Sequence, residues 1–236
     1  MTGIGRAIVE ELIKRGAAKV YAAARNTDAL KELVAASNGR VVAVRLDVTS
    51  EDQIQAAAKI ASDTQILFNN AGINNYTGII SVPNSESARA EMEVNYFGLM
   101  NMTRVFAPIL GNNGGGVLVN LCSAAGLVGI PAVGTYAATK AAVHSLTQSV
   151  RGELKAQGTH VLCVYPGPID TDMSAGLDFE KETPQHVAGE IFEGIELGAE
   201  EVYPDKVALD FAVKLKTDAK GLEKEWSGML PQPVEV

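Results

Sequence analysis

Short apolar runs alternate with longer amphipathic stretches along this chain. The runs expected as strands occupy residues 19–25, 40–46, 65–69, 117–121 and 160–165, with a brief sixth at 201–203. Between them, apolar residues recur at helical spacing, as Ile8, Val9, Leu12 and Ile13 do within residues 5–15. Strands that alternate with helices build βαβ units around a parallel sheet. The pattern therefore predicts an α/β fold.

The remaining helices are expected between the strands and near the carboxyl end. A capping box at Ser50 and Gln53 begins one of them, and Thr183 caps another with Pro184 in its first position. The chain shows no internal repeat, low-complexity tract or linker, so residues 1–236 are expected to form one domain. The expected helices span 5–15, 27–36, 51–61, 86–110, 133–156, 183–197 and 206–226, the last as one or two helices.

Composition and charge exclude several classes of function. The 236 residues are 47% hydrophobic, with a net charge of −8 and a pI near 5.0, and the basic residues are scattered. This disfavours a role on nucleic acid or on an anionic membrane. No apolar run approaches the ~18 residues of a membrane span, and no signal peptide is visible, so a cytoplasmic protein is expected. The three histidines are isolated, which predicts no metal site.

The pair Tyr136 and Lys140 is the most informative chemical feature. Residues four apart lie on one face of a helix. A lysine ammonium beside a phenol favours the phenolate, so we expect Lys140 to lower the pKa of Tyr136 and make it a proton donor or acceptor. Ser123 ends the β-rich run 116–123, so its hydroxyl should emerge at the carboxyl end of the strand, where ligands bind in open α/β sheets. Taken alone, each residue has a structural alternative, such as a packed ring, a solvated charge or a turn cap.

Four further motifs accompany this group in order along the chain. They are Gly3-Ile4-Gly5, Asn69-Asn70-Ala71-Gly72, the segment 93–98 around Asn95, and Pro166-Gly167-Pro168-Ile169-Asp170-Thr171. With Ser123, Tyr136 and Lys140, this set resembles the short-chain dehydrogenase/reductase family, most closely over residues 2–172. The resemblance implies a Rossmann-type doubly wound parallel sheet flanked by helices, and an oxidoreductase that uses a nicotinamide cofactor on a carbonyl or alcohol.

The resemblance also implies a role for each matching residue. Tyr136 would be the general acid or base, Lys140 would lower its pKa and bind the nicotinamide ribose, Ser123 would hold the substrate oxygen, and Asn95 would complete a proton relay. Asp47 and Val48 would contact the adenine, and Asp47 has a turn cap as its structural alternative. The implied cofactor contacts are Gly3, Ile4, Gly5, Asp47, Val48, Asn70, Ala71, Gly72, Tyr136, Lys140, Pro166, Gly167, Ile169 and Thr171.

Arg25 decides the expected cofactor. In dinucleotide-binding folds, an acidic residue about 20 positions after the glycines binds the ribose hydroxyls of NAD, whereas an arginine accommodates the 2′-phosphate of NADP. Counting from Gly5, that position is Arg25, and no acidic residue ends the strand 19–25. A guanidinium binds phosphate with bidentate geometry. We therefore expect NADP rather than NAD, with a solvated surface arginine as the alternative.

The chain departs from the family pattern at its amino end. The family fingerprint lies between a first strand and a first helix, but here only Met1 to Gly5 precede the helix, so that strand and the first glycine are missing. The predicted sheet is N-terminally truncated, and the strands 19–25 and 65–69 should lack their shared neighbour. A late start, an engineered truncation and a degenerate copy remain alternatives for Met1.

Three hypotheses about function follow. The first is an NADP-dependent carbonyl reductase. The second is a catalytically inactive or incomplete homologue that only binds partners. The third is a nucleotide-sugar epimerase-like enzyme, which the Asn69–Gly72 motif and the lack of a large C-terminal domain oppose.

Met173, Leu177 and Phe179 are the bulky apolar residues expected at a short, open substrate pocket. Family members pair through their two long helices, so a homodimer or homotetramer is expected.

Overall fold

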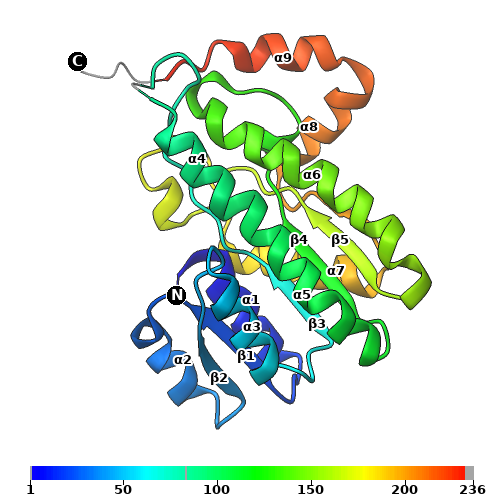
Figure 1. Ribbon diagram of the computed structural model, residues 1–236. Coiled ribbons are helices and arrows are strands. Elements are labelled where there is room, and N and C mark those ends of the chain that lie inside the picture. Colours follow the sequence, from blue (N-terminus) through cyan, green and yellow to red (C-terminus); the bar gives the residue numbers. More distant parts are fainter. Residues whose placement is uncertain (1, 83, 232–236) are drawn as a thin grey trace.

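The computed structural model describes residues 2–82 and 84–231 (Figure 1). Its strands are parallel to their hydrogen-bonded neighbours and helices cover both faces, which confirms the predicted Rossmann-type α/β fold. The strands are β1 (Val20–Ala24), β2 (Val41–Arg45), β3 (Ile66–Asn69), β4 (Val117–Leu121), β5 (His160–Val164) and β6 (Glu201–Val202).

The helices lie in the predicted stretches, but some of these stretches contain more than one helix. The stretch 206–226, expected as one or two helices, forms two that meet at Asp218, whose side chain caps the second. The region 27–36 begins as a 3-10 turn, Thr27–Leu30. The α-helices are α1 (Gly3–Lys14), α2 (Lys31–Ala36), α3 (Glu51–Ile60), α4 (Glu86–Met92), α5 (Leu99–Asn112), α6 (Gly134–Leu154), α7 (Pro184–Glu196), α8 (Lys206–Thr217) and α9 (Ala219–Ser227).

The helix expected over 86–110 contains a π-helical segment, Glu93–Gly98, between α4 and α5. Such widened turns occur often at functional sites. The predicted capping box at the start of α3 is only half formed. Ser50 accepts a hydrogen bond from the Gln53 backbone, but the Gln53 side chain accepts from the backbone N–H of Asp47 instead of Ser50. The caps at Thr183 and Pro184 are as predicted.

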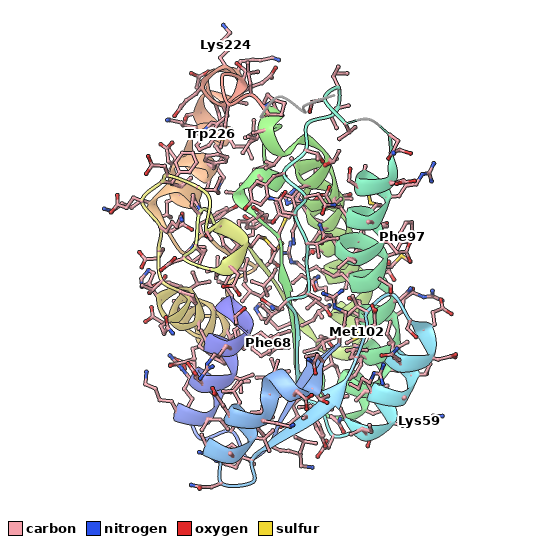
Figure 2. All side chains as sticks on the ribbon, turned by 90° about the vertical axis from the view of Figure 1, so that its left-hand side faces the viewer. Lys59, Phe68, Phe97, Met102, Lys224 and Trp226 are labelled. Atoms are coloured by element: carbon pink, nitrogen blue, oxygen red, sulfur yellow. The ribbon has the colours of Figure 1, made fainter. Side chains whose placement is uncertain are left out.

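Two apolar layers hold the helices on the sheet. Leu67 of β3 packs with α3 and α5, while the adjacent Phe68 packs with Phe192 of α7, because successive side chains of a strand point to opposite faces. Figure 2 shows Phe68 and Met102 in the interior of the molecule. Among the described residues, no helix is long and apolar enough to cross a membrane.

The sheet is interrupted where the sequence predicted a missing strand. β1 pairs with β2, and β3 pairs with β4, β5 and β6 in that order, but β1 and β3 do not pair with each other. The two parts are joined by helices and by side-chain contacts. The expectation that β1 and β3 lack their shared neighbour is confirmed.

Buried amides connect β3 and β4 to the helices below them. Asn69 donates to Thr103 at 3.1 Å and to Asn120 at 2.9 Å, and Asn120 donates to Thr147 at 3.0 Å. Asn120 is completely buried. Because buried polar groups must be paired, these bonds fix the positions of β4 and α6, and hence of Ser123 and Tyr136, relative to each other.

We expect Asn120→Leu to lower the free energy of unfolding by about 1–3 kcal/mol, because Asn69 and Thr147 would each lose a buried partner. Urea unfolding followed by circular dichroism measures the change. Asn101→Leu is the control, since the side chain of Asn101 on α5 makes no hydrogen bond among the described residues. An equal loss of unfolding free energy in both variants would show that these amide hydrogen bonds do not stabilise the fold.

Candidate active site

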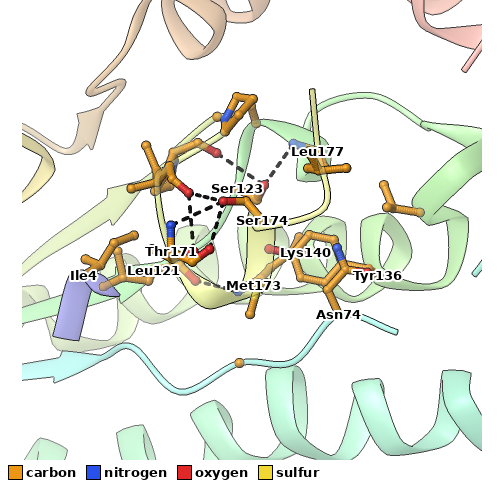
Figure 3. Close-up of a pocket in the computed structure, with 18 of the residues that line it drawn as sticks. Ile4, Asn74, Leu121, Ser123, Tyr136, Lys140, Thr171, Met173, Ser174 and Leu177 are labelled. Carbon is orange, nitrogen blue, oxygen red and sulfur yellow. Dashed lines mark hydrogen bonds between the residues drawn. The ribbon is translucent and has the colours of Figure 1, made fainter. Parts of the chain in front are cut away.

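A cavity of about 440 Å³ lies at the carboxyl ends of β4 and β5, beside the amino end of α1. Figure 3 shows Ser123, Tyr136 and Lys140 together in it. The predicted residues that line it are Gly3, Ile4, Gly5, Asn70, Ala71, Gly72, Ser123, Tyr136, Lys140, Pro166, Gly167, Ile169 and Thr171. The fold thus brings together residues from four of the five motif groups.

Three predicted cofactor residues lie in a second cavity. Arg25, Asp47 and Val48 line a space of about 710 Å³ that also reaches Gly5, Asn70, Ala71 and Gly72. The two cavities therefore meet at Gly5 and residues 70–72. An extended ligand that touched every predicted cofactor residue would cross this junction.

Asn95 lines neither cavity and is completely buried in the π-helical segment. Its side chain exchanges two hydrogen bonds with the backbone of Ile73, at 2.8 and 2.9 Å, and donates to Thr139 of α6 at 2.9 Å. These bonds hold the segment after Gly72 against the helix that carries Tyr136. In this structure Asn95 acts as a positioning residue; its part in a proton relay remains a prediction.

The electrostatics of Tyr136 differ from the expectation. Burial raises the pKa of Tyr136, and a contact with the Ser123 hydroxyl lowers it to a smaller extent. Burial also lowers the pKa of Lys140, whose Nζ donates to the carbonyl of Leu121 at 2.8 Å and lies 5.6 Å from the centre of the Tyr136 ring. The predicted lowering of the Tyr136 pKa by Lys140 was wrong for this structure, because burial disfavours both charged forms.

Other predicted residues have local structural roles as well. Ser123 accepts a hydrogen bond from the backbone of Ala125 at 3.2 Å, so it caps the turn after β4. Asp47 accepts two bonds from Thr49, at 3.0 and 2.8 Å, which lower its pKa. The structural alternatives given for Ser123 and Asp47 are therefore present, and neither excludes a ligand contact by the remaining oxygen lone pairs.

Two glycines lie where other parts of the protein approach the backbone too closely for a side chain. A Cβ on residue 72 would lie 3.3 Å from Asn95 Oδ1 and 3.6 Å from Lys140 Nζ. Gly3 has a φ of +58°, and a Cβ there would lie 2.9 Å from Thr171 Cγ2. Glycine is therefore needed at both positions for the chain to pack. The amino end of α1, which favours anions, lies at the cavity with Gly3 and Gly5, and it could hold the pyrophosphate of a dinucleotide.

Sequence reasoning missed residues from the carboxyl-terminal part of the chain. Trp226 of α9 and Phe211 of α8 line the 440 Å³ cavity, with ring centres 4.8 Å apart, and Met229 lies beside them. Figure 2 shows Trp226 at the end of the molecule opposite β1 and β2. The substrate pocket was expected to have only the short segment 172–182 as its apolar wall, and this was wrong. The one tryptophan of the chain was the available signal.

Asp205 was also missed. It is buried, accepts from the backbone N–H of Gly167 at 2.7 Å, and caps α8 through Ala208 at 2.9 Å. It thereby fixes the turn Pro166–Gly167, which lines the cavity, to the start of α8. An aspartate directly before a helix is a recognisable cap, but its bond to Gly167 spans 38 residues and has no local signature.

The cysteines and histidines are not among the residues predicted for the site. Cys122 and Cys163 are free and buried. The Nδ1 of His144 on α6 contacts the hydroxyl of Tyr165 at 2.7 Å, so His144 joins this helix to the residue that follows β5. Within residues 2–82 and 84–231, no group of three or more histidine, cysteine, aspartate or glutamate side chains is placed to hold a metal ion.

Comparison with known proteins agrees with this arrangement. The family model for short chain dehydrogenase matches residues 1–182. An uncharacterized oxidoreductase of Staphylococcus epidermidis is 33% identical over 182 residues, covering 75% of this chain and 78% of that protein.

Solved structures share the fold over nearly the whole chain. A short chain dehydrogenase from Burkholderia cenocepacia in complex with NADP is 38% identical, with a TM-score of 0.90 over 95% of this chain and 93% of its own. A short chain dehydrogenase/reductase from Burkholderia phymatum in complex with NAD is 25% identical, with a TM-score of 0.82 over 100% and 94%.

Proposed function

Because this chain belongs to the short-chain dehydrogenase family and is an oxidoreductase of that family, we propose that it transfers a hydride between NADP(H) and the carbonyl or alcohol carbon of a small molecule. The observation that carries the proposal is the single cavity in which Ser123, Tyr136 and Lys140 face the residues of the glycine motifs. We treat residues 1–236 as one dinucleotide-binding and catalytic domain.

Three residues of the cavity, and Asn95 beside it, each have a part in the proposed reaction. The bound nicotinamide supplies or accepts the hydride. The Tyr136 hydroxyl gives a proton to the substrate oxygen during reduction, and the Ser123 hydroxyl holds that oxygen. Burial raises the pKa of Tyr136 and so favours the protonated hydroxyl, the form that donates a proton. Lys140 binds the ribose, and Asn95 holds the adjacent backbone in place.

Arg25 supports NADP over NAD. It is exposed just after β1, lines the 710 Å³ cavity, and makes no ion pair or hydrogen bond among the described residues. A free guanidinium at this position is available for a 2′-phosphate. The B. cenocepacia protein was solved with NADP, whereas the B. phymatum protein was solved with NAD, so the family relationship alone does not select the cofactor.

Titration of the purified chain with NADPH and with NADH, followed by nicotinamide fluorescence, tests this proposal. We expect binding that is at least about tenfold tighter for NADPH, because one charge-assisted phosphate contact contributes ~1.5–3 kcal/mol. Equal affinities would contradict the role of Arg25. Binding of neither cofactor would contradict the proposal for the chain in this form.

The cavity wall favours an uncharged, apolar substrate. Beyond the predicted cofactor residues, the wall consists mainly of apolar and aromatic side chains. Of the described residues that line it, Lys140 and Asp172 alone carry charge. The apolar wall residues are Ile130, Val133, Met173, Leu177, Phe179, Val207, Phe211, Trp226 and Met229.

We expect Trp226→Ala to raise the KM for a bulky apolar ketone about 10–100-fold, because loss of one buried aromatic contact costs ~1.5–3 kcal/mol. The Kd for NADPH should stay unchanged, since Trp226 lies outside the predicted cofactor residues. Steady-state kinetics with cyclic and aliphatic ketones measure the effect. Leu230→Ala is the control, because Leu230 is nearby in sequence and 70% exposed. The same KM in both variants would contradict the proposed wall.

The interrupted sheet favours a second candidate, an incomplete homologue that binds partners without turnover. A chain of this kind would bind no cofactor, or would bind it and reduce no ketone.

We also propose self-association through α4, α5 and α6, as a homodimer or homotetramer. Phe97, which is 41% exposed beside α5 in Figure 2, is an apolar contact available to it. Sedimentation velocity measures the assembly.

A further inference from the structure

Tyr76 has a backbone conformation that is unusual for an aromatic residue. Its φ is +54°, in the left-handed region that favours glycine because a Cβ crowds the backbone there. Among the described residues, Asn38 is the only other non-glycine residue with a positive φ, and its short polar side chain suits that region. Strained residues persist where the surrounding structure holds them, and they occur often at active sites. Tyr76 is therefore a candidate for a role at the 440 Å³ cavity, which it lines.

The segment that carries Tyr76 is fixed at both ends. At its start, Asn95 holds the backbone of Ile73 through the two hydrogen bonds described above. At its end, the carbonyl of Thr77 accepts hydrogen bonds from the backbone N–H of Thr135 at 3.3 Å and from the Thr135 hydroxyl at 3.2 Å. Thr135 directly precedes the candidate catalytic tyrosine on α6. The segment therefore has a fixed position relative to that tyrosine.

A buried carboxyl group holds the centre of the segment 73–77. Glu91 of α4 is completely buried, and one of its carboxyl oxygens accepts a hydrogen bond from the backbone N–H of Asn75 at 2.6 Å. The other oxygen has no hydrogen-bond partner among the described residues. Burial of a polar group without a partner costs free energy. An incompletely paired buried group is typical of a position that serves function at some cost to stability.

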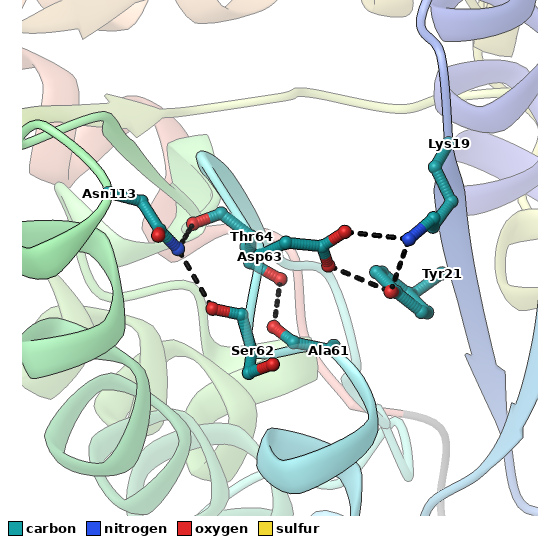
Figure 4. Close-up of polar contacts among 7 residues, drawn as sticks. All are labelled: Lys19, Tyr21, Ala61, Ser62, Asp63, Thr64 and Asn113. Atoms are coloured by element: carbon teal, nitrogen blue, oxygen red, sulfur yellow. Dashed lines mark hydrogen bonds and ion pairs between the residues drawn. The ribbon is translucent and has the colours of Figure 1, made fainter.

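The carboxylate of Asp63 shows the more usual arrangement. It accepts hydrogen bonds from Lys19 at 2.6 Å and from the Tyr21 hydroxyl at 2.7 Å, so both of its oxygens are paired (Figure 4). Water also reaches this group, because the Asp63 side chain is 56% exposed. Glu91 has neither the solvent nor, within the described part of the chain, a second partner. The segment that it holds, and not an ion pair, therefore accounts for its position.

The side chain of Tyr76 lies where the 440 Å³ cavity meets solvent. Tyr76 lines the cavity and is also 38% exposed, and the same holds for Met173, which is 41% exposed. The Tyr76 hydroxyl donates a hydrogen bond to the backbone carbonyl of Met173. Burial raises the pKa of Tyr76, and Tyr136 raises it further because the two phenols are near each other. Tyr76 thus bounds the cavity beside the proposed proton donor.

From this geometry we infer that Tyr76 is a specificity-determining residue, whose ring limits the size of the group that a ketone carries on one side of its reacting carbonyl. The inference rests on the proposed function, because Tyr136 marks where that carbonyl lies. The substrate class is then a ketone with one small substituent, such as methyl, and one larger apolar substituent. Glu91 is a positioning residue, because it holds the segment that directs the ring of Tyr76.

A purely structural role does not explain why the ring of Tyr76 is there. A glycine would make the same turn without strain. The hydrogen bonds that fix the segment come from its backbone and from Asn95, Glu91 and Thr135, so none of them needs a side chain at residue 76. The contact with Met173 lies at the surface, where one hydrogen bond adds little stability. The ring that this residue brings to the cavity is the gain that remains.

Trp226 supplies a measure of ketone binding that is independent of turnover. It lines the same cavity and is the only tryptophan of the sequence, so a ligand in the cavity should change its fluorescence. The full chain is titrated with cyclohexyl ketones whose second substituent is methyl, ethyl, isopropyl or tert-butyl. The Kd should rise at least about tenfold from the methyl to the tert-butyl ketone, because added methyl groups overfill a bounded pocket. In Tyr76→Ala this ratio should fall at least about fivefold. An unchanged ratio would overturn the inference.

Two further variants separate the ring of Tyr76 from its hydroxyl and from its backbone. Tyr76→Phe keeps the ring and loses the contact with Met173, so it should keep the size discrimination. Tyr76→Gly should show the same ratio of Kd values as Tyr76→Ala but melt at least about 2 °C higher, because glycine relieves the strain of a positive φ. Loss of discrimination in Tyr76→Phe, or equal melting of the glycine and alanine variants, would contradict the proposed role.

The role of Glu91 is tested with a conservative and a disruptive change. Glu91→Gln keeps an oxygen for the backbone N–H of Asn75 and should keep the ratio of Kd values. Glu91→Leu removes that oxygen, so the segment relaxes and the ratio should fall towards that of Tyr76→Ala. Glu93→Leu is the matched control, since Glu93 is exposed on the same helical stretch and should leave the ratio unchanged. Equal ratios in Glu91→Leu and Glu93→Leu would contradict the positioning role.

Steady-state reduction of the same ketones with NADPH separates this inference from the proposed function. The ratio of kcat/KM between the methyl and the tert-butyl ketone should follow the ratio of Kd values in every variant. Binding with the expected size limit but without turnover would support the limit set by Tyr76 and contradict the proposed function. Turnover without a size limit would overturn the inference alone, and no fluorescence change with any ketone would overturn both.

Discussion

Tyr136→Phe is expected to lower kcat for ketone reduction about 10²–10⁴-fold and to leave NADPH binding intact. A positioned general acid contributes a factor of this size, and only the hydroxyl is removed. The phenylalanine ring can keep the packing of Tyr136 on Ala124, Ala125 and their neighbours. The hydroxyl contact with Ser123 is lost, but Ser123 retains its bond with Ala125. Stopped-flow reduction and NADPH titration measure the two effects separately.

Tyr96→Phe is the matched control for this change. Tyr96 is a partly buried tyrosine in the π-helical segment, and it lines neither cavity. The Tyr96→Phe variant should keep the kcat of the unmodified protein. If Tyr136→Phe also kept its turnover, Tyr136 would not be the proton donor. If it lost NADPH binding and melted at a lower temperature, the hydroxyl would be structural.

Arg25→Asp is expected to reverse the cofactor preference, with a change of at least about 100-fold in the ratio of the Kd values for NADPH and NADH. The substitution removes a charge-assisted phosphate contact of ~1.5–3 kcal/mol and adds a carboxylate that repels the 2′-phosphate and accepts bonds from ribose hydroxyls. The affected group is exposed, so the fold should be unchanged. Nicotinamide fluorescence with both cofactors measures the ratio.

Arg45→Asp makes the same change of charge at the end of β2, one strand away. Arg45 is exposed and lines neither cavity. The Arg45→Asp substitution should leave the ratio of the Kd values for NADPH and NADH within about twofold of that of the unmodified protein, because exposed charges at a distance are screened. A comparable shift in both variants would show that net charge, rather than a contact at Arg25, sets the preference.

The sequence predicted which residues meet at the cavity where their position depends on the chain nearby. Ser123 and Thr171 follow strands, and the carboxyl ends of parallel strands meet at one edge of a sheet. Tyr136 and Lys140 lie one turn apart on α6 because of helical spacing. Sequence pattern and spacing were therefore enough to identify the individual residues that meet at the cavity.

Residues that act through distant partners were not predictable in this way. Trp226 reaches the cavity because α8 and α9 fold back over the segment after β5, and Asp205 reaches Gly167 for the same reason. The Asn69–Asn120 bond joins residues 51 positions apart. None of these contacts leaves a periodic signal, because each depends on how complete elements pack together.

The amino-acid sequence by itself determined the order of strands and helices, the family, and the interruption between β1 and β3, because each follows from local periodicity and from motifs in a fixed order. The tertiary structure decided the environment of those motifs. Burial, which no local pattern reports, raises the pKa of Tyr136 against the expected effect of Lys140. Packing of α8 and α9 closes the apolar wall of the 440 Å³ cavity, because both helices fold back over it.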